Sequence, residues 1–427
     1  MAKVAVVGAG IIGATIAARL IIDGHHVISF EPEPHGLPTS SGNAALIALP
    51  EIAPIASPGM FSQVPKWLLD PLGPLTLHWL DIPALLPWLI AFLARATPSH
   101  VSQARTALSN LMRTALADHR TLGEAIGLTD HLRQTGYMSL HDSMASLVAA
   151  KQEAEQVREL LDFDYAVLTP QEARHLEPRL EGQFAGAIHQ PSYWTATNPL
   201  TVLRAYQSFV AGRAEMVAER VLRLSQGQDG ITVHTPTSAA LFDKVVVAAG
   251  IWSRDLVRPL GTKVLLETER GYNTTYSDLG WNLNLPIGFA DHGFVATPLV
   301  DGLRVGGAVE LARPETSPNY ARARAMRIKM RRYVPSLPEG GTEWMGRRPS
   351  TPDSIPVIGP HPGDERIVHA FGHGHLGLTL SAVTARLVSA LISDAAIDID
   401  PSPYELHRFG QKNGRLAGSR NAPRQPG

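Results

Sequence analysis

Apolar residues at the amino terminus form two short runs separated by one longer periodic run. Residues 3–7 and 27–30 are rich in Val, Ile and Ala, so they predict two buried strands. Between them, residues 11–22 carry apolar side chains at helical spacing, and Gly24 is typical of a helix end. The pattern is therefore strand, glycine-rich turn, helix and strand, which is half of a nucleotide-binding unit.

The middle of the chain is mostly helical and then becomes richer in strands. Helices are predicted over 102–125 and 144–161, around one short strand-like piece at 136–140. Further on, a helix is predicted at 199–210, with strands at 186–190, 231–234 and 245–248. Residues 263–309, with turns at several glycines, predict an antiparallel sheet.

The carboxyl-terminal part returns to an α/β pattern. A basic helix near 320–333 is followed by a strand at 366–371, a glycine cluster and an apolar helix at 378–392. We therefore expect an α/β fold with a Rossmann-like domain assembled from discontinuous segments, and an α+β substrate domain with a mostly antiparallel sheet. The FAD-binding domain is expected to consist of residues 1–60, 195–258 and 345–410. The substrate domain with its helical cap is expected at 61–194 and 259–344, and residues 411–427 are expected to form a disordered tail.

Composition narrows the classes of function. The chain has 38 basic and 39 acidic residues and a formal charge of −1, so it has no overall field that would attract nucleic acid. It has no cysteine, which excludes disulfides, thiolate nucleophiles and Cys-bound metals. Its 17 histidines show no spacing typical of metal ligands, so we expect no metal site.

The apolar stretch at 67–94 contains Trp67, Trp79 and Trp88 but is interrupted by prolines and acids, so it is too short to span a bilayer. Two interpretations remain open: it caps the substrate domain, or it contacts the membrane surface. The start of the chain lacks the pattern of a secretory signal. We expect a cytoplasmic protein, with peripheral contact to the inner face of the membrane under the second interpretation.

The glycine-rich turn carries the first chemical signal. Gly8 suits the tight turn, Gly10 lets a pyrophosphate approach the backbone, and Gly13 allows close packing of the helix. Glu31 follows the second strand, where a carboxylate can accept hydrogen bonds from ribose hydroxyls. The loop predicted to bind the dinucleotide consists of Gly8, Ala9, Gly10, Ile11, Ile12 and Gly13. This motif alone does not distinguish FAD from NAD, because both contain the same ADP half.

Five other stretches resemble FAD-dependent D-amino-acid dehydrogenases, within the group that includes D-amino-acid oxidase, glycine oxidase and sarcosine oxidase. They are 39–45 (Thr-Ser-Ser-Gly-Asn-Ala-Ala), 243–253, Arg270-Gly271-Tyr272, 344–359 around Gly346-Arg347-Arg348-Pro349, and 372–379. Ala45 stands where the family usually has glycine. The resemblance implies FAD as cofactor, with contacts from Ser40, Ser41, Asn43, Ala44, Ala249, Gly250, Trp252, Gly374, His375, Leu376, Gly377, Leu378 and Thr379.

The resemblance also implies which residues meet the substrate. Arg348 would bind the carboxylate of an amino acid, whereas Arg347 would point to the other face of an extended strand. Tyr272 and Tyr276 would share a face, and either could contact the carboxylate or simply pack in the core. His375 is a candidate neighbour of flavin or substrate, although a histidine at a helix entry with no catalytic role fits equally well.

The implied reaction is oxidative deamination of a small D-amino or imino acid. Hydride would pass from the α-carbon to flavin N5, leaving a 2-oxo acid and ammonia or a cyclic imine, and quinone or another acceptor would take the electrons. Three alternatives stay open: a glycine- or sarcosine-type oxidase using oxygen, a flavin-binding subunit of a larger amine dehydrogenase, and an NAD-dependent dehydrogenase.

Overall fold

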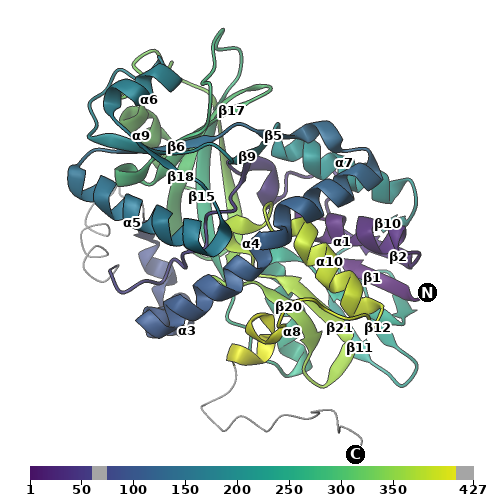
Figure 1. Cartoon of the computed structure of the whole chain (residues 1–427). Coiled ribbons are helices and arrows are strands. Elements are labelled where there is room, and N and C mark those ends of the chain that lie inside the picture. The colour runs from purple at the N-terminus through teal and green to yellow at the C-terminus, as the bar shows by residue number, and fades with distance from the viewer. Residues whose placement is uncertain (60–74, 410–427) are drawn as a thin grey trace, which may run out of the picture.

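The structure is a computed structural model that describes residues 1–59 and 75–409. Two large sheets dominate it, one in the lower and one in the upper half of the view in Figure 1. The expected tail at 411–427, and residues 67–74 of the apolar segment, lie outside the described residues.

The lower sheet has six strands in the order β10-β2-β1-β14-β21-β20, all parallel except the edge strand β20. Its strands are β1 (Lys3–Val7), β2 (His26–Phe30), β10 (Glu215–Val217), β14 (Lys244–Val247), β20 (Val357–His361) and β21 (Asp364–Phe371). Neighbouring strands thus come from three distant parts of the chain, as the discontinuous α/β pattern predicted. Strands buried on both faces explain why their sequences are continuously apolar.

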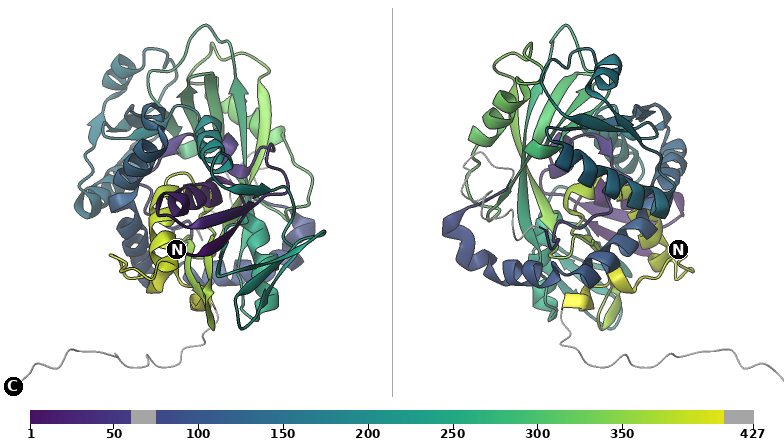
Figure 2. Two further views of the ribbon diagram at one scale, coloured as in Figure 1. Left: turned by 90° about the vertical axis from the view of Figure 1, so that its right-hand side faces the viewer. Right: turned by 60° about the vertical axis from the view of Figure 1, so that its left-hand side comes forward.

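Helices cover one face of this sheet and a small antiparallel sheet covers the other. Apolar side chains of α1 (Ile11–Ile22), α4 (Pro98–Ile126), α7 (Pro199–Ala211) and α10 (Ser381–Ile392) share one core with it. The opposite face packs on the sheet formed by β11 (Arg223–Gln226), β12 (Ile231–His234) and β13 (Ala239–Phe242). Figure 2 shows α10, in yellow, beside the purple amino-terminal elements.

The upper sheet has nine strands and is mostly antiparallel, in the order β19-β15-β18-β17-β16-β6-β8-β7, with β4 added beside β18. Its strands are β4 (Leu75–Leu77), β6 (Tyr137–His141), β7 (Ala166–Leu168), β8 (Gly186–Gln190), β15 (Glu267–Tyr276), β16 (Ile287–Phe289), β17 (Phe294–Leu299), β18 (Gly302–Leu311) and β19 (Thr342–Ser350). A separate small sheet joins β3 (Leu46–Ile47), β5 (Leu132–Gln134) and β9 (Trp194–Ala196).

The remaining helices are α3 (Ile82–Arg95), α5 (Met144–Leu161), α6 (Pro170–Leu176), α8 (Ser253–Val257) and α9 (Ala321–Met330). Of these, three contact the upper sheet (α5, α6 and α9), and two share the core on the second face of the lower sheet (α3 and α8). Two segments cross the expected domain borders. Strand β19 belongs to the upper sheet although the nucleotide range was expected to begin at 345. Helix α4, expected in the substrate cap, packs its alanine- and leucine-rich face on α10.

Helix α3 has two apolar faces. Leu85, Trp88 and Phe92 are buried, and the Trp88 indole N–H donates to the backbone carbonyl of Ser350 at 2.9 Å. This inner face caps the body of the protein. On the outer face Leu86, Ile90 and Leu93 are exposed, and Trp79 just before the helix is 72% exposed.

Within the described residues no single helix is long and apolar enough to cross a membrane; the segments Trp79–Arg95 and Pro98–Ile126 meet that test only as a pair bent by 95°.

Candidate active site

The glycine-rich loop leaves the amino terminus of α1 open. A Cβ on Gly8 would lie 2.5 Å from the Ala248 carbonyl oxygen, and one on Gly13 would lie 1.8 Å from the Gly8 oxygen, so backbone packing requires both glycines. A Cβ on Gly10 would meet no atom within 4 Å, and no side chain caps the helix there. The free N–H groups and the helix dipole therefore suit a phosphate.

Glu31 lies beside this loop at the end of β2. Its Oε2 accepts a hydrogen bond from the Ala9 N–H at 2.9 Å, and Gln207 of α7 donates to the Ala9 carbonyl at 2.8 Å. These contacts hold the loop against the end of β2, where Glu31 was predicted to bind the ribose of a dinucleotide.

Two later segments converge on the same loop. The segment after β14 is held beside Gly8 by the hydrogen bond from the Ala248 N–H to the Val7 carbonyl at 2.9 Å. The segment at 372–379 approaches from the other side, since a Cβ on Gly377 would lie 4.0 Å from the Ile11 side chain. Both were predicted to contact the cofactor from sequence positions more than 100 residues apart.

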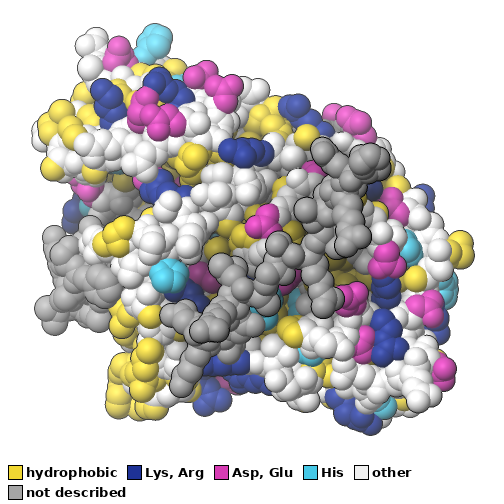
Figure 3. Space-filling view, turned by 60° about the horizontal axis from the view of Figure 1, so that its bottom comes forward, with side chains coloured by type: hydrophobic (Ala, Val, Ile, Leu, Met, Phe, Trp, Pro, Cys, Tyr) yellow, Lys and Arg dark blue, Asp and Glu magenta, His cyan; other side chains and the backbone are white. Residues whose placement is uncertain are grey.

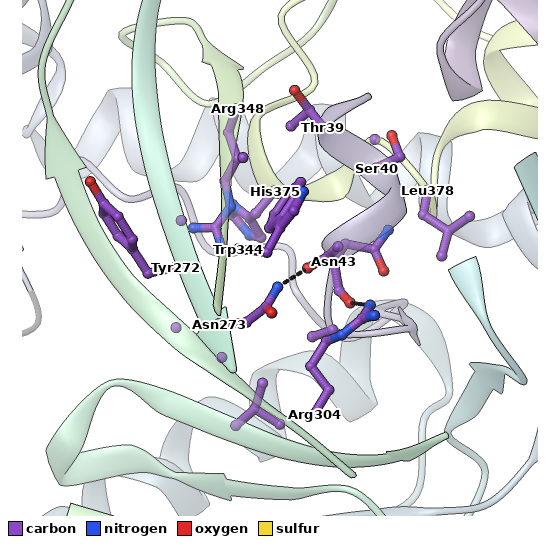
Figure 4. A pocket seen from close by; sticks show the side chains of 18 of the residues that line it. Thr39, Ser40, Asn43, Tyr272, Asn273, Arg304, Trp344, Arg348, His375 and Leu378 are labelled. Carbon is purple, nitrogen blue, oxygen red and sulfur yellow. Dashed lines mark hydrogen bonds between the residues drawn. The ribbon is translucent and has the colours of Figure 1, made fainter. Parts of the chain in front are cut away.

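A cavity opens between residues 39–44 and 374–378 on one side and the upper sheet on the other (Figure 4). Among the predicted site residues, those that line it are Ser40, Asn43, Ala44, Tyr272, Arg348, Gly374, His375, Gly377 and Leu378. The predicted site residues that do not line it include Ser41, Ala249, Gly250, Trp252, Leu376 and Thr379. The Ser40 hydroxyl and the Ala44 N–H have no hydrogen-bond partner among the described residues, so donors remain free for a cofactor at this wall.

Arg348 lies on β19 opposite Glu269 of β15, and its guanidinium crosses over Gly271. Burial lowers the pKa of Arg348, and the nearby Glu269 opposes that shift. Within residues 1–59 and 75–409 its guanidinium forms no hydrogen bond or ion pair. A half-buried guanidinium whose donors are unused and face a cavity is suited to bind an anion.

The neighbouring arginines have other partners. Arg347 donates from Nε to the Pro314 carbonyl at 2.8 Å. Arg270 is fully buried, donates to backbone carbonyls of 313–317 and lies 3.6 Å from Glu310.

Tyr272 presents its ring to the cavity, but its hydroxyl is already bound. The hydroxyl donates to the Glu310 carboxylate and accepts from the Asn319 N–H at 3.0 Å. Burial and the bond to Glu310 raise the pKa of Tyr272 to about 12. In Figure 4 the hydroxyl points away from Arg348, so this geometry favours wall packing over a hydrogen bond to a ligand. Tyr276 is buried in the same core and does not line the cavity.

His375 and His373 are neutral at ordinary pH. His375 is exposed at the cavity, but desolvation by the surrounding protein atoms, with a smaller contribution from the Arg348 charge, lowers its pKa to about 4. Burial lowers the pKa of His373 to about 3, and its Nε2 lies 3.0 Å from the Thr384 hydroxyl. Only His375 of the two lines the cavity, so it can offer a neutral imidazole to a ligand.

The sequence did not single out Asn273, Arg304 or Trp344 as site residues, although all three line the cavity. Arg304 interrupts the apolar strand Leu303-Arg304-Val305, and a charged residue in such a strand is a signal that could have revealed it. No group of three or more potential metal ligands occurs in the described part of the chain.

Comparisons with known proteins identify the family of the chain. The chain matches the family model described as FAD dependent oxidoreductase over residues 3–391. It is 33% identical to a D-amino-acid oxidase of Bradyrhizobium diazoefficiens, over 95% of this chain and 98% of the relative. It is 31% identical to a D-amino acid dehydrogenase of Sinorhizobium medicae, over 96% of this chain and all of the relative.

Solved structures share the fold at lower identity. Glycine oxidase from Geobacillus kaustophilus superimposes with a TM-score of 0.72 at 22% identity, covering 96% of this chain and 99% of that one. L-proline dehydrogenase from P. horikoshii gives 0.72 at 19% identity, covering 95% and 97%.

Proposed function

Because the chain belongs to the family of FAD-dependent oxidoreductases and is an enzyme that acts on amino acids, we propose that it oxidises a small D-amino acid whose carboxylate is bound by Arg348. The D-configuration is supported by the names of relatives about 30% identical over nearly the full chain. The role of Arg348 is supported by the structure of the cavity.

One observation carries the assignment to Arg348. Among the arginines beside the cavity within the described residues, its guanidinium alone lacks a hydrogen bond, whereas Arg347, Arg270 and Arg304 donate to backbone carbonyls. Arg348 is half-buried and its donors are unused by the part of the protein that the structure describes, so a bound carboxylate could form paired charge-assisted hydrogen bonds with it.

The other residues of the cavity define what a bound substrate would meet. The wall opposite the cofactor segments is built from Gly271, Val295, Gly306 and Gly307, with the ring of Tyr272. No carboxylate lines the cavity within the described residues, so the wall favours a small, neutral side chain. With His375 neutral, the charges that the described residues bring to the cavity are those of Arg348 and Arg304, and Arg304 already donates to backbone carbonyls.

FAD would be held by the glycine loop with Glu31, by Ser40 to Ala44 and by the segment at 372–379, and it supplies the acceptor for two electrons from the α-carbon. Arg348 would then fix which hydrogen of the substrate faces that acceptor. Oxidation of the C–N bond gives an imino acid, and water converts it to a 2-oxo acid and ammonia.

The decisive experiment is an anaerobic titration of the yellow holoprotein with D- and L-amino acids, following the loss of flavin absorbance. We expect small neutral D-amino acids to bleach the flavin and their L-enantiomers to leave it oxidised. Bleaching by L-enantiomers alone would overturn the stereochemical proposal. Retained colour with every amino acid would favour a flavin-binding subunit that needs a partner chain.

Arg348→Met tests the residue, with Arg347→Met as the matched control. Removing the guanidinium should raise the half-bleaching concentration about 100-fold, equivalent to roughly 2.8 kcal/mol, while the protein stays yellow. Arg347→Met should remain close to the unaltered protein because its side chain contacts a loop carbonyl outside the cavity. An unchanged titration for Arg348→Met would remove Arg348 from carboxylate binding.

We further propose that the electrons pass to a membrane quinone rather than to oxygen. This is supported by the outer face of α3, where Leu86, Ile90, Leu93 and Trp79 are exposed, since apolar helix faces with tryptophan suit a membrane interface. In Figure 3 hydrophobic side chains gather at the lower left, the side on which α3 lies.

The test compares the reoxidation of reduced holoprotein by oxygen and by a soluble quinone, and its cosedimentation with phospholipid vesicles. We expect fast reoxidation by quinone and vesicle binding that Ile90→Asp abolishes. Fast reoxidation by oxygen, without vesicle binding, would instead identify an oxidase.

A further inference from the structure

Three consecutive backbone carbonyls of the segment after Pro38 are held by side chains of the upper sheet. Asn273 of β15 donates from Nδ2 to the Gly42 carbonyl at 2.6 Å. Arg304 of β18 donates from Nη1 to the carbonyls of Asn43 at 2.7 Å and Ser41 at 3.3 Å. Figure 4 shows Asn273 and Arg304 reaching the segment from the same side.

Other contacts tie the same segment to the same sheet. The Thr39 hydroxyl donates to the Arg347 carbonyl of β19 at 3.0 Å. The indole of Trp344 lies over Gly42 so closely that a Cβ there would be 2.4 Å from the ring. Strands β15, β18 and β19 therefore all contact the short 3-10 helix η1 (Thr39–Gly42) and the residues after it.

Arg304 is a buried charged residue whose hydrogen bonds go mainly to backbone carbonyls, which is unusual for an arginine. It is 8% exposed and forms no ion pair among the described residues; burial lowers its pKa to about 10, which still leaves it protonated at neutral pH. Its Nε donates to the Thr275 hydroxyl at 3.0 Å, and its Nη1 donates to two carbonyl oxygens of the 41–43 segment. These neutral oxygen acceptors are therefore what stabilises its charge. An uncompensated buried cation is expensive, and this arginine and this segment therefore depend on each other.

The direction of the carbonyls determines what the segment offers to the cofactor. With the oxygens of Ser41, Gly42 and Asn43 turned toward the sheet, the Ser40 hydroxyl and the Ala44 N–H remain free at the cavity. Ala45 follows with a φ of +59°, and the Asn43 side chain accepts its N–H at 2.7 Å. An alanine in this left-handed region costs about 1 kcal/mol, so the conformation has to be imposed by its surroundings.

We propose that Arg304 and Asn273, although they belong to the substrate sheet, are positioning residues for FAD: they hold the 41–43 carbonyls so that the segment presents donors to the cofactor. This inference rests on FAD binding by the segment at 39–45, and it does not depend on which amino acid is oxidised or on the role of Arg348. It follows that removing either side chain weakens FAD binding, although both residues belong to the substrate sheet and not to the glycine loop.

The test measures FAD dissociation from reconstituted apoprotein by flavin fluorescence, together with the flavin circular dichroism spectrum. Arg304→Met should weaken FAD binding at least 10-fold and change the dichroism, and Arg304→Lys should recover part of the affinity because one ammonium can still bond a carbonyl. Arg324→Met on α9, whose side chain is 52% exposed, is the matched control and should bind FAD as the unaltered protein does.

Asn273→Ala provides a second measurement that leaves the buried charge in place. We expect it to weaken FAD binding several-fold, and to combine with Arg304→Met less than additively, because both act through one segment. FAD affinity and dichroism unchanged in both single variants would overturn the proposal. So would a loss of apoprotein stability in Asn273→Ala with FAD affinity retained, since that outcome marks a merely structural contact. Failure of the amino-acid titration alone would affect only the proposed substrate.

Discussion

The guanidinium of Arg348 rests directly on the backbone of Gly271, where a Cβ would lie 2.3 Å from Nη2. Gly271 of β15 pairs with Gly346 of β19, two residues before Arg348 on the same strand. The absence of a side chain on β15 thus provides the space in which the arginine extends toward the cavity.

Gly271→Ala should displace Arg348 while leaving the backbone undisturbed. We expect the KM for the amino acid to rise about 10-fold or more with FAD still bound, because a small shift of a binding group is costly to a substrate it positions. Steady-state kinetics with flavin content measured in parallel check this. Gly212→Ala, at an exposed helix end where the nearest atom is 3.5 Å away, should leave the KM unchanged.

Trp88→Phe should destabilise the protein. It removes the donor to the Ser350 carbonyl and part of the buried contact with Phe92, whose ring stacks on it at 5.0 Å. We expect a loss of about 1 kcal/mol or more in the free energy of unfolding, measured with urea. Trp79→Phe is the control: since that side chain is 72% exposed, the same measurement should change by less than about 0.5 kcal/mol.

Gly10→Ala and Gly13→Ala should separate cofactor binding from folding. The backbone at Gly10 (φ −64°, ψ −178°) accepts alanine and no protein atom opposes its Cβ, so the apoprotein should keep its melting temperature. Its FAD affinity should fall about 10-fold or more, because the methyl group occupies space needed by the pyrophosphate. Gly13→Ala should lower the melting temperature itself. Equal FAD affinity in Gly10→Ala would show that the pyrophosphate lies elsewhere.

His373 should make the protein less stable in acid. Burial holds its pKa at about 3 against 6.5 for an unburied histidine, so between those values the unfolded chain takes up a proton that the folded one does not. Stability is therefore lost as pH falls from 6.5 toward 3, by about 1.4 kcal/mol per pH unit from this group. His373→Gln should flatten the dependence of unfolding free energy on pH in that window, whereas exposed His35→Gln should not.

Local sequence patterns predicted the elements of the fold better than their grouping. The helices at 144–161 and 199–210 appear at those positions within one residue, because both combine clear apolar periodicity with a capping Ser143 or Asn198. The placement of α4 on α10 was not predicted, since periodicity shows that a helix has an apolar face and not which partner covers it.

The same distinction holds for the cavity. Motif residues such as Asn43, Gly374 and Arg348 were named from the sequence and line it together. Asn273 and Arg304 were missed because they bind backbone carbonyls 231 and 261 residues away along the chain. Every residue has a carbonyl group, so no sequence motif marks such an acceptor. The bond between the Tyr272 hydroxyl and Glu310 was likewise not predicted, because no local pattern indicates it.

The interleaving of distant strands in the lower sheet has a consequence for synthesis. Strand β14 pairs with β1 on one side and with β21 on the other, and β21 ends at Phe371. A ribosome must therefore translate most of the message before that edge of β14 is covered, and until then the unpaired N–H and C=O groups of this apolar strand are open to pairing with other chains. Chaperone demand and early aggregation should be greatest in this interval, and a truncation that omits β21 should yield no folded nucleotide-binding half.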